Sequence, residues 1–503
     1  MIEREIKLSA WPAFTLPDLD GVADGARTAR RETIDLDATY FDTPDLRLGR
    51  RGITLRHRRR GPRETWTLKL PAGASGLDGG LARDEIDVSA PAGDIPERLA
   101  LLVAGHVRTQ SLRKVARLMT VRRRTLVKDA EGMVLAEIDD DEVSVMAGGR
   151  VAARFREIEV EIAPDAEAEV AEAVIDRLRR AGAGPGGTLP KVARAVGPGF
   201  LEPPEGDVTP LPDDPTAADV IALAVRSSVA RLLDHHAMAI LGDDPEGVHQ
   251  MRVATRRLRS DLRTFRPLLD RDVTDPLRRE LKWLGEILGG VRDADVLTPR
   301  IADGATRTLE ASDAPAVATV LDRLAADRGA AVVVLHESLG SDRYRRLLDA
   351  LVALAVAPPV RRSASAPAVD VLPDLVARPW RHLRKAVGSS GDQPSGEELH
   401  EVRKRAKAAR YAAEAVEPAI GKPARRAAKG AKAVQSVLGD HQDTVVAEEW
   451  FRSTMAAPGV AVSAAFVLGA LTADERAERA ELRSAWPAAW HKASQPKRWS
   501  WLP

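Results

Sequence analysis

Acidic and basic side chains alternate with apolar ones near the start of the chain, where residues 2–8 read IEREIKL. Successive side chains of a β-strand point to opposite faces, so a strand here would carry Glu3, Glu5 and Lys7 on one face. Carboxylates of this kind bind divalent cations, and an ammonium group binds phosphate. Short patterns also recur by accident on exposed edge strands, so the interpretation depends on the segments that follow.

Several later segments of the first 200 residues repeat the two-residue period of a strand, and most carry charges of one sign. Basic side chains fall on strand faces at Arg56 and Arg58, Lys69, Arg83, and Arg122 and Arg124. Acidic side chains fall at Glu137 and Asp139, and at Glu157, Glu159 and Glu161. Like charges in a row on a strand repel one another, so the acidic rows need cations opposite them. A sheet with this segregation predicts a site for a metal ion and a phosphate-rich anion.

In chain order these motifs resemble the CYTH family, the triphosphate tunnel metalloenzymes. The resemblance rests on E-x-E-x-K at 3–7, YFDT at 40–43, LRHR at 55–58, WTLK at 66–69, the two acidic strands, and Lys191 with Arg194. It implies an N-terminal closed antiparallel β-barrel whose lumen binds a linear triphosphate. The implied reaction is metal-dependent hydrolysis of inorganic triphosphate to pyrophosphate and phosphate.

The resemblance also implies a role for each matching residue. The ligands of Mg²⁺ or Mn²⁺ would be Glu3, Glu5, Asp139, Glu157, Glu159 and Glu161. The residues that bind the triphosphate would be Lys7, Arg56, Arg58, Lys69, Arg83, Arg122, Arg124 and Lys191. Glu3, Glu5 and Lys7 would be catalytic. A P-loop motif and cysteine are both absent from the sequence, so neither P-loop nor thiol chemistry is expected.

A segment rich in proline and acid, EPPEGDVTPLPDDP at 202–215, separates the strand-like region from a region with helical patterning. A chain of 503 residues is also long enough for more than one domain. We therefore expect a multidomain α+β protein, with a triphosphate-tunnel domain at 1–201, a linker at 202–215 and an all-α domain at 216–503.

One pattern of basic residues occurs twice in the second region. The first copy is His249, Arg252, Arg256 and Arg259, and the second is His400, Arg403, Lys407 and Arg410. Both copies have the spacing of one stripe along an α-helix. Lys282 and Lys432 follow at matching distances, as do Asp293 and Asp443. The repeat predicts two similar helical hairpins with two-fold internal symmetry and a basic surface suited to an extended anion.

These repeats resemble the CHAD domain, a helical, histidine-containing module often attached to CYTH domains. The resemblance implies a helical bundle with a basic groove for inorganic polyphosphate. Its contacts would be His249, Arg252, Arg256, Arg257, Arg259, Lys282, His400, Arg403, Lys404, Lys407, Arg410 and Lys432. A solvated helix face laced with ion pairs is the ordinary alternative for such arginines.

The composition disfavours other classes of protein. Lysine and arginine (75) almost cancel aspartate and glutamate (74), and aromatic residues are not interleaved with the basic stripes, so a nucleic-acid partner is disfavoured. We expect no membrane partner, and we expect a cytoplasmic protein that associates with polyphosphate granules. Two alternatives stay open: a polyphosphate-binding scaffold with an idle barrel, and a barrel that acts on thiamine triphosphate, a nucleotide or an RNA 5′ end, or that cyclises ATP.

Overall fold

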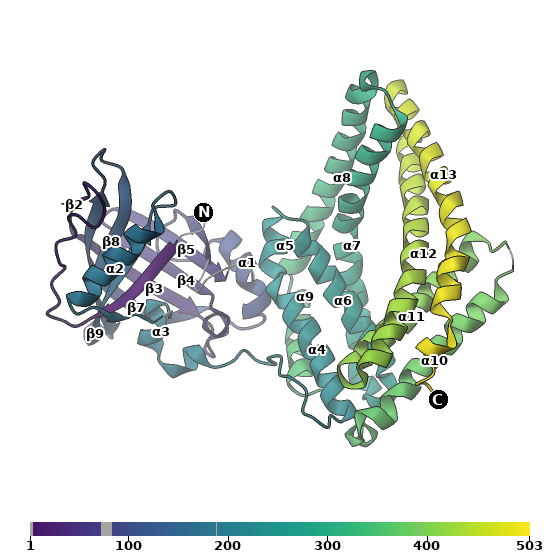
Figure 1. Cartoon of the computed structure of the whole chain (residues 1–503), viewed down its shortest axis with the longest axis horizontal. Helices are drawn as coiled ribbons and strands as arrows, with labels where there is room; N and C mark the ends of the chain where they lie inside the picture. The colour runs from purple at the N-terminus through teal and green to yellow at the C-terminus, as the bar shows by residue number, and fades with distance from the viewer. Residues whose placement is uncertain (1–3, 72–82, 188, 392) are drawn as a thin grey trace. The chain divides into compact units, whose positions relative to one another are not determined.

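The computed structural model describes residues 4–71, 83–187, 189–391 and 393–503, and the chain divides into two compact units. The first unit is Met1–Pro204 and the second is Glu205–Pro503 (Figure 1). An antiparallel sheet forms the first unit and helices form the second. The predicted order of an antiparallel β domain followed by an all-α domain is therefore confirmed.

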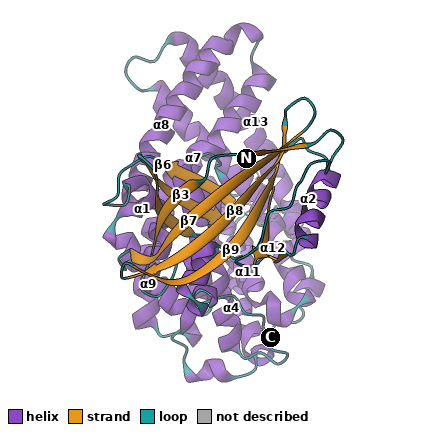
Figure 2. Cartoon of the chain, turned by 90° about the vertical axis from the view of Figure 1, so that its left-hand side faces the viewer, coloured by secondary structure: helices purple, strands orange, loops and turns teal. Residues whose placement is uncertain are grey.

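The sheet of the first unit contains ten strands among the described residues, and its strands pair antiparallel. Their bounds are β1 (Arg4–Ala10), β2 (Arg27–Arg30), β3 (Ile34–Asp42), β4 (Thr54–Arg60), β5 (Arg63–Pro71), β6 (Arg83–Val88), β7 (Arg113–Lys128), β8 (Val134–Ala147), β9 (Arg150–Ile162) and β10 (Gly184–Pro185). The order is β10-β1-β9-β8-β7-β3-β4-β5-β6, and β2 also pairs with β7. Figure 2 shows β3, β7, β8 and β9 side by side. Over the described strands this pairing does not close, so the barrel stays a prediction.

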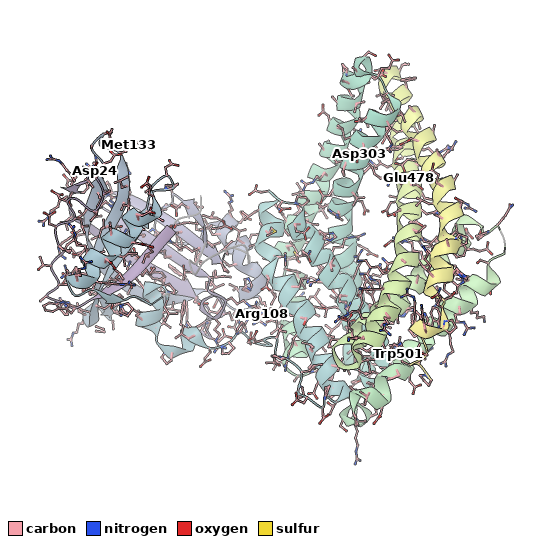
Figure 3. The ribbon with its side chains drawn as sticks, in the orientation of Figure 1. Asp24, Arg108, Met133, Asp303, Glu478 and Trp501 are labelled. Carbon is pink, nitrogen blue, oxygen red and sulfur yellow. The ribbon has the colours of Figure 1, made fainter. Side chains whose placement is uncertain are left out.

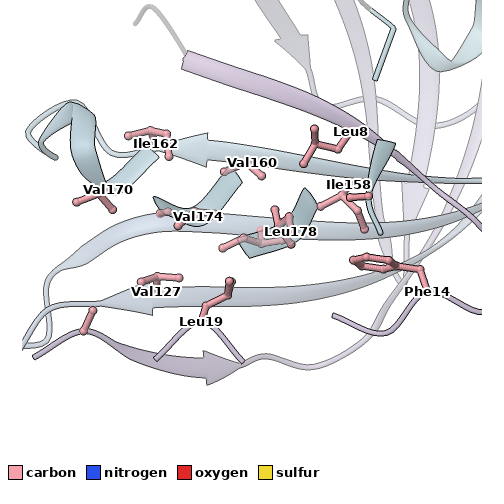
Figure 4. Close-up of a cluster of buried hydrophobic side chains, with 14 residues drawn as sticks. Leu8, Phe14, Leu19, Val127, Ile158, Val160, Ile162, Val170, Val174 and Leu178 are labelled. Atoms are coloured by element: carbon pink, nitrogen blue, oxygen red, sulfur yellow. The ribbon is translucent and has the colours of Figure 1, made fainter. Parts of the chain in front are cut away.

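One face of the sheet is apolar and is covered by helix α2 (Ala168–Arg180). Val170, Val174 and Leu178 recur at helical spacing and pack against Ile158 and Val160 of β9 (Figure 4). Because strand side chains alternate, burial of this set turns the glutamates of β9 to the opposite face. The sheet can therefore carry charge on one face without losing its core.

Helix α3 (Lys191–Val196) packs on the charged face of the sheet. Val192 belongs to an apolar cluster that also contains Leu118 of β7, Val143 of β8 and Phe200. Leu118 and Val143 share strand faces with the charged residues further along β7 and β8. This packing places Lys191, the first residue of α3, over the acidic strands. Helix α1 (Glu97–Val107) follows β6 in the same unit.

The second unit is built from long helices that form antiparallel hairpins. Their bounds are α4 (Ala217–Asp234), α5 (His236–Leu241), α6 (Glu246–Thr264), α7 (Arg271–Thr308), α8 (Ala314–Gly340), α9 (Asp342–Val356), α10 (Ala368–Ser389), α11 (Gly396–Ile420), α12 (Lys422–Met455) and α13 (Val462–Ala493). Helix α6 packs on α7, α11 packs on α12, and α6 contacts α11. The helices that carry the two basic stripes are therefore neighbours.

Ion pairs and an apolar cluster connect helix α7 to helix α13. Arg300 of α7 donates hydrogen bonds to Glu475 of α13 at 2.9 and 2.5 Å, and Arg307 donates to Asp474 at 2.6 Å. Figure 3 labels Asp303 and Glu478 on the same two helices. Ile301 and Leu468 belong to the apolar cluster beneath these pairs.

No helix in the described part of the chain combines the length and apolar character needed to cross a membrane.

The contact between α2 and the sheet gives a prediction for stability. Leu178 is fully buried, so Leu178→Ala leaves a cavity and should lower the free energy of unfolding of the first unit by about 2–5 kcal/mol. Scanning calorimetry of the whole protein should show one transition at a lower temperature and the other unchanged. Arg180→Ala, on the same helix with an 82% exposed side chain, is the control and should shift neither transition. An unchanged first transition in Leu178→Ala would contradict this packing.

Candidate functional site

Four buried carboxylates lie together on the charged face of strands β8 and β9: Asp139, Asp141, Glu157 and Glu159. The strand register places Asp139 opposite Glu159 and Asp141 opposite Glu157. Lys7 of β1 is opposite Glu159 on the other side of β9. Burial raises the pKa of Asp139 and Glu157, because it disfavours their charged forms. Such a group needs cations nearby, and five form ion pairs with it: Arg122, Lys191 and Lys7, together with Arg124 at 3.2 Å from Asp139 and Arg194 at 3.7 Å from Glu157.

Arg122 of β7 is the first of these cations. Its guanidinium group donates to Asp141 at 2.8 and 2.7 Å and to Glu159 at 2.8 Å, and it also contacts Asp139. Although burial lowers the pKa of Arg122, these carboxylates raise it well above its usual range. The bidentate pair fixes the position of the guanidinium plane.

Two lysines, Lys191 and Lys7, also form ion pairs with these carboxylates. Lys191 Nζ lies 2.7 Å from Asp141 and 2.6 Å from Glu159, and Lys7 Nζ lies 3.3 Å from Glu159. Although burial lowers the pKa of Lys191, the neighbouring carboxylates raise it above its usual range. Residues far apart in the sequence, on β1, β7 and α3, thus converge on one acidic row.

A second wall of the charged face is formed by strands β4, β5 and β6. Lys69 Nζ lies 2.7 Å from Glu85, and Arg56 lies 3.6 Å from the same carboxylate and 3.5 Å from the Tyr40 hydroxyl. Arg58 has no ion-pair partner among the described residues. Burial, together with the positive charges of Arg56 and Arg122, lowers the pKa of Arg58. An anion in this space would meet Arg58 without displacing a carboxylate.

The structure brings most of the predicted residues of the first unit onto this one face. Arg124 lies 2.7 Å from Glu137 and 3.2 Å from Asp139. Glu161 is opposite both Glu137 and Glu5 in the strand register. Glu3 lies outside the described residues, and the side chains of Glu5 and Arg83 also lie outside what the structure describes.

Sequence reasoning missed Asp141 and Tyr40 as members of this face. Asp141 continues the two-residue period that begins at Glu137 and Asp139, so the period itself carried the signal. Tyr40 gave no such signal, because its contact with Arg56 depends on the pairing of β3 with β4.

Carboxylate oxygens are the ligands that Mg²⁺ and Mn²⁺ prefer, so the acidic row has suitable chemistry for such an ion. Within the described residues, however, no group of three or more acidic or histidine side chains is arranged to hold a metal. The carboxylates are turned instead towards Arg122, Lys191 and Lys7. Glu157 Oε1 is a buried oxygen that accepts no hydrogen bond, and it lies 3.6 Å from Lys191. The chemistry of the donor set therefore suits a divalent cation, although in this structure the carboxylates pair with basic side chains.

The helical unit contains a second charged site, on helices α6 and α11. Five side chains form what we call the inner cluster: Arg252, Arg256, Arg259, Arg403 and Lys407. Burial and the four surrounding arginines lower the pKa of Lys407 to about 7. The Nε atoms of Arg256 and Arg403 are buried and find no hydrogen-bond acceptor among the described residues. Arg252 lies 3.8 Å from Asp293, so acids compensate this cluster only weakly.

The other residues predicted for the polyphosphate site lie outside the inner cluster or beside it. Arg257 and Arg410 both donate to Glu414, at 2.5 and 2.6 Å, and this carboxylate joins α6 to α11. His400 Nδ1 lies 2.6 Å from Gln442, and burial and nearby arginines lower the pKa of His249. The remaining predicted residues are exposed lysines, namely Lys282, Lys404 and Lys432.

Together these features define a two-part protein, with an antiparallel sheet that carries a charged face and a helical unit that carries a basic cluster. Family models match both parts: the CYTH domain model matches residues 1–191 and the CHAD domain model matches residues 223–452. The chain therefore belongs to the family of proteins in which a CYTH domain is fused to a CHAD domain, as the sequence motifs predict.

Similar proteins are found for the whole chain and for the helical part. Rv2226 of Mycobacterium tuberculosis is 34% identical over 502 residues, which is 94% of this chain and 93% of that protein. Among solved structures, PptA from Streptomyces chartreusis is 25% identical, with 55% of this chain and 99% of that chain covered and a TM-score of 0.46. The CHAD domain from the plant Ricinus communis is 26% identical, with 57% and 96% covered and a TM-score of 0.47.

The oxygen of Glu157 that accepts no hydrogen bond gives a prediction for metal binding. Glu157→Gln removes a charged oxygen ligand, so the affinity of the whole protein for Mn²⁺ should fall about tenfold or more. Electron paramagnetic resonance of free Mn²⁺ during a titration measures this affinity without any turnover. The matched control is Glu142→Gln, on the opposite face of β8, where Glu142 pairs with Arg123 at 3.2 Å. Equal Mn²⁺ affinity in the two variants would contradict a metal role for Glu157.

Proposed function

We propose that the chain is a metal-dependent triphosphatase that hydrolyses inorganic triphosphate on the charged face of the sheet, and that its helical unit binds inorganic polyphosphate. The observation that supports the hydrolase most strongly is the set of buried carboxylates held against Arg122, Lys191 and Lys7. Burial of charged side chains costs desolvation free energy, so a sheet face that is merely solvated would not bury so many charges in one place. We also propose that the sheet closes into a triphosphate tunnel and that the hairpins α6–α7 and α11–α12 are pseudo-symmetric halves.

Cations on two walls would position the substrate. Arg56 and Arg58 extend from β4, and Arg122 and Lys191 extend from β7 and α3, so a linear triphosphate between them meets a cation at each phosphate. These groups offset the charge that develops on the transferred phosphoryl group. Water attacks the terminal phosphorus. A bond forms between the water oxygen and this phosphorus, the bridging P–O bond breaks, and the products are phosphate and pyrophosphate. Glu3, Glu5 and Lys7 remain the residues that are predicted to be catalytic.

The CYTH family depends on divalent cations, and the acidic row is where such an ion would be held. Asp139, Glu157, Glu159 and Glu161 are the carboxylates that would hold it, and Glu3 and Glu5 are the further ligands that the sequence predicts. When bound, Mg²⁺ or Mn²⁺ supplies charge neutralisation to phosphate oxygens and activates water. The phosphate chain would bind Arg122 and Lys191 in place of the carboxylates, and this exchange would leave the carboxylates available to bind the metal ion.

The inner cluster supports polyphosphate as the partner of the helical unit. Its cations come from two helices, and two of its buried Nε–H groups lack an acceptor among the described residues. A polyphosphate chain presents an anionic oxygen at every phosphate, so it could satisfy all five cations at once. Binding of long chains would also place the enzyme on polyphosphate granules.

The proposed reaction predicts which substrate releases phosphate. Tripolyphosphate should be hydrolysed strongly with Mg²⁺ or Mn²⁺ and should stay intact with EDTA. ATP, thiamine triphosphate and long-chain polyphosphate should release little phosphate under the same conditions. If no substrate releases phosphate while polyphosphate still binds, the protein is a binding scaffold.

Single-site variants should separate the two activities. Glu159→Gln should lower tripolyphosphate hydrolysis by about a hundredfold or more, because it removes a charge that orients Arg122 and Lys191, and should leave polyphosphate binding unchanged. The double variant Arg252→Gln with Arg256→Gln should do the reverse. Phosphate release and isothermal titration with long-chain polyphosphate measure the two properties, and Glu142→Gln is the control for the sheet. Equal loss of both properties in either variant would rule out two separate sites.

The pKa of Lys407 predicts that binding of polyphosphate takes up a proton. Its folded-state pKa of about 7 lies below the usual 10.5, so Lys407 is largely neutral at about pH 8.5 and an anion drives it to the charged form. Affinity should therefore fall as the pH rises from 7. Titration calorimetry in buffers of different ionisation enthalpy measures the proton uptake. Lys407→Gln should abolish the uptake at this pH, and an unchanged uptake in this variant would assign the proton to another group.

A further inference from the structure

A second group of cations lies on the helical unit, beyond the basic stripes that the sequence repeat defines. It consists of Arg263 of α6, Arg278 of α7, Arg378 and His382 of α10, and Arg405 of α11, and we call it the outer cluster. The charges of Arg405, Arg278 and Arg378 all act on Arg263, and the carboxylate of Glu401 opposes them. The imidazole of His382 lies among Arg405, Arg378 and Arg263. Four helices thus bring like charges to one place.

Acids compensate only part of this charge. Glu401 accepts a hydrogen bond from Arg405 at 2.6 Å, and Asp275 accepts one from Arg278 at 3.3 Å. The side chains of Arg263 and Arg378 belong to exposed residues and have no ion-pair partner among the described residues. Arg278 Nε is buried, and within the described chain it finds no acceptor. Like charges held together repel, so the fold maintains a cost that an anion would remove.

The outer cluster is continuous with the inner cluster. Arg259 connects the two clusters. The charge of Arg278, in the outer cluster, acts on Arg259, and the charge of Arg259 acts on Lys407 in the inner cluster. Arg263 continues the stripe of α6 by one further turn, whereas Glu414 stands at the equivalent place in the second repeat. At about 1.5 Å per residue, Arg252 and Arg263 are about 16 Å apart along the helix axis. The cationic surface is thus longer than a triphosphate can cover and extends to one side only.

We propose that the outer cluster is a second phosphate subsite, which binds the distal part of a polyphosphate chain whose other part occupies the inner cluster. This inference rests on the proposed binding of polyphosphate by the helical unit, and it adds a preference for long chains. Guanidinium groups suit the repeated anionic oxygens of such a chain. The described residues that form the cluster include no tryptophan, tyrosine or phenylalanine, so a single-stranded nucleic acid would lack its usual row of stacking rings.

The test uses the whole protein and long-chain polyphosphate in isothermal titrations at several salt concentrations. In the double variant Arg263→Gln with Arg378→Gln, affinity should fall about tenfold, and the slope of log affinity against log salt should become shallower by about 1.5, because two phosphate contacts are lost. The matched control is Arg323→Gln with Arg346→Gln, which removes the same charge from helices α8 and α9. Its slope and affinity should equal those of the unmodified protein.

The outcomes separate this inference from the function beneath it. If the unmodified protein binds no polyphosphate, the proposed function of the helical unit is wrong. If Arg252→Gln with Arg256→Gln weakens binding and the outer variant behaves like its control, only the second subsite is wrong. If RNA at equal phosphate concentration displaces polyphosphate, and the outer variant abolishes that competition, the cluster is a nucleic-acid site instead. Circular dichroism of each variant verifies that the helices are intact.

Discussion

The row of glutamates on strand β9 is the constraint on which the first unit depends. The apolar residues that alternate with Glu157 and Glu159 are buried under α2, so these carboxylates must lie on the opposite face of the sheet. Like charges in a row repel, and burial strengthens the repulsion. Arg122 and Lys191 must therefore reach this row from β7 and α3. The pairing of distant segments and the charged site are two results of one arrangement.

The helical unit solves the opposite problem, because its excess charge is positive. Packing of apolar side chains between α6, α7, α11 and α12 holds the inner cluster together, and few acids lie close to it. Glu414 stabilises the crossing of α6 and α11 through Arg257 and Arg410, to one side of the cluster. Buried Asp261 beside Arg257 has a pKa raised by burial to about 7, so part of this support is itself weakly charged. Most of the positive charge of the inner cluster is therefore not neutralised by acidic side chains.

Much of the charged face could be predicted from the sequence, because strand periodicity fixes which residues share a face. That rule placed Glu157 with Glu159 on one strand face and Arg122 with Arg124 on another, and the resemblance to the CYTH family assigned both sets to one site. It could not show that Arg257 and Arg410 belong to an ion-pair bridge, because Arg410 lies on a basic stripe, Arg257 lies beside one, and Glu414 is remote from Arg257 in sequence. The outer cluster was missed for a related reason: its arginines come from four helices, and only tertiary packing makes them neighbours.

The two sites differ in how they accept a phosphate chain, and this difference has a consequence for metal dependence. On the sheet, a bound phosphate would have to replace carboxylates as the partner of Arg122 and Lys191, and the released carboxylates would repel until a cation neutralised them. Under the proposed function, triphosphate and a divalent cation would therefore favour each other's binding there. In the inner cluster, Arg256 and Arg403 have Nε–H groups without an acceptor in the described chain, so phosphate displaces few acids. Under the proposed function, polyphosphate binding by the helical unit would therefore not need a metal, whereas hydrolysis on the sheet would.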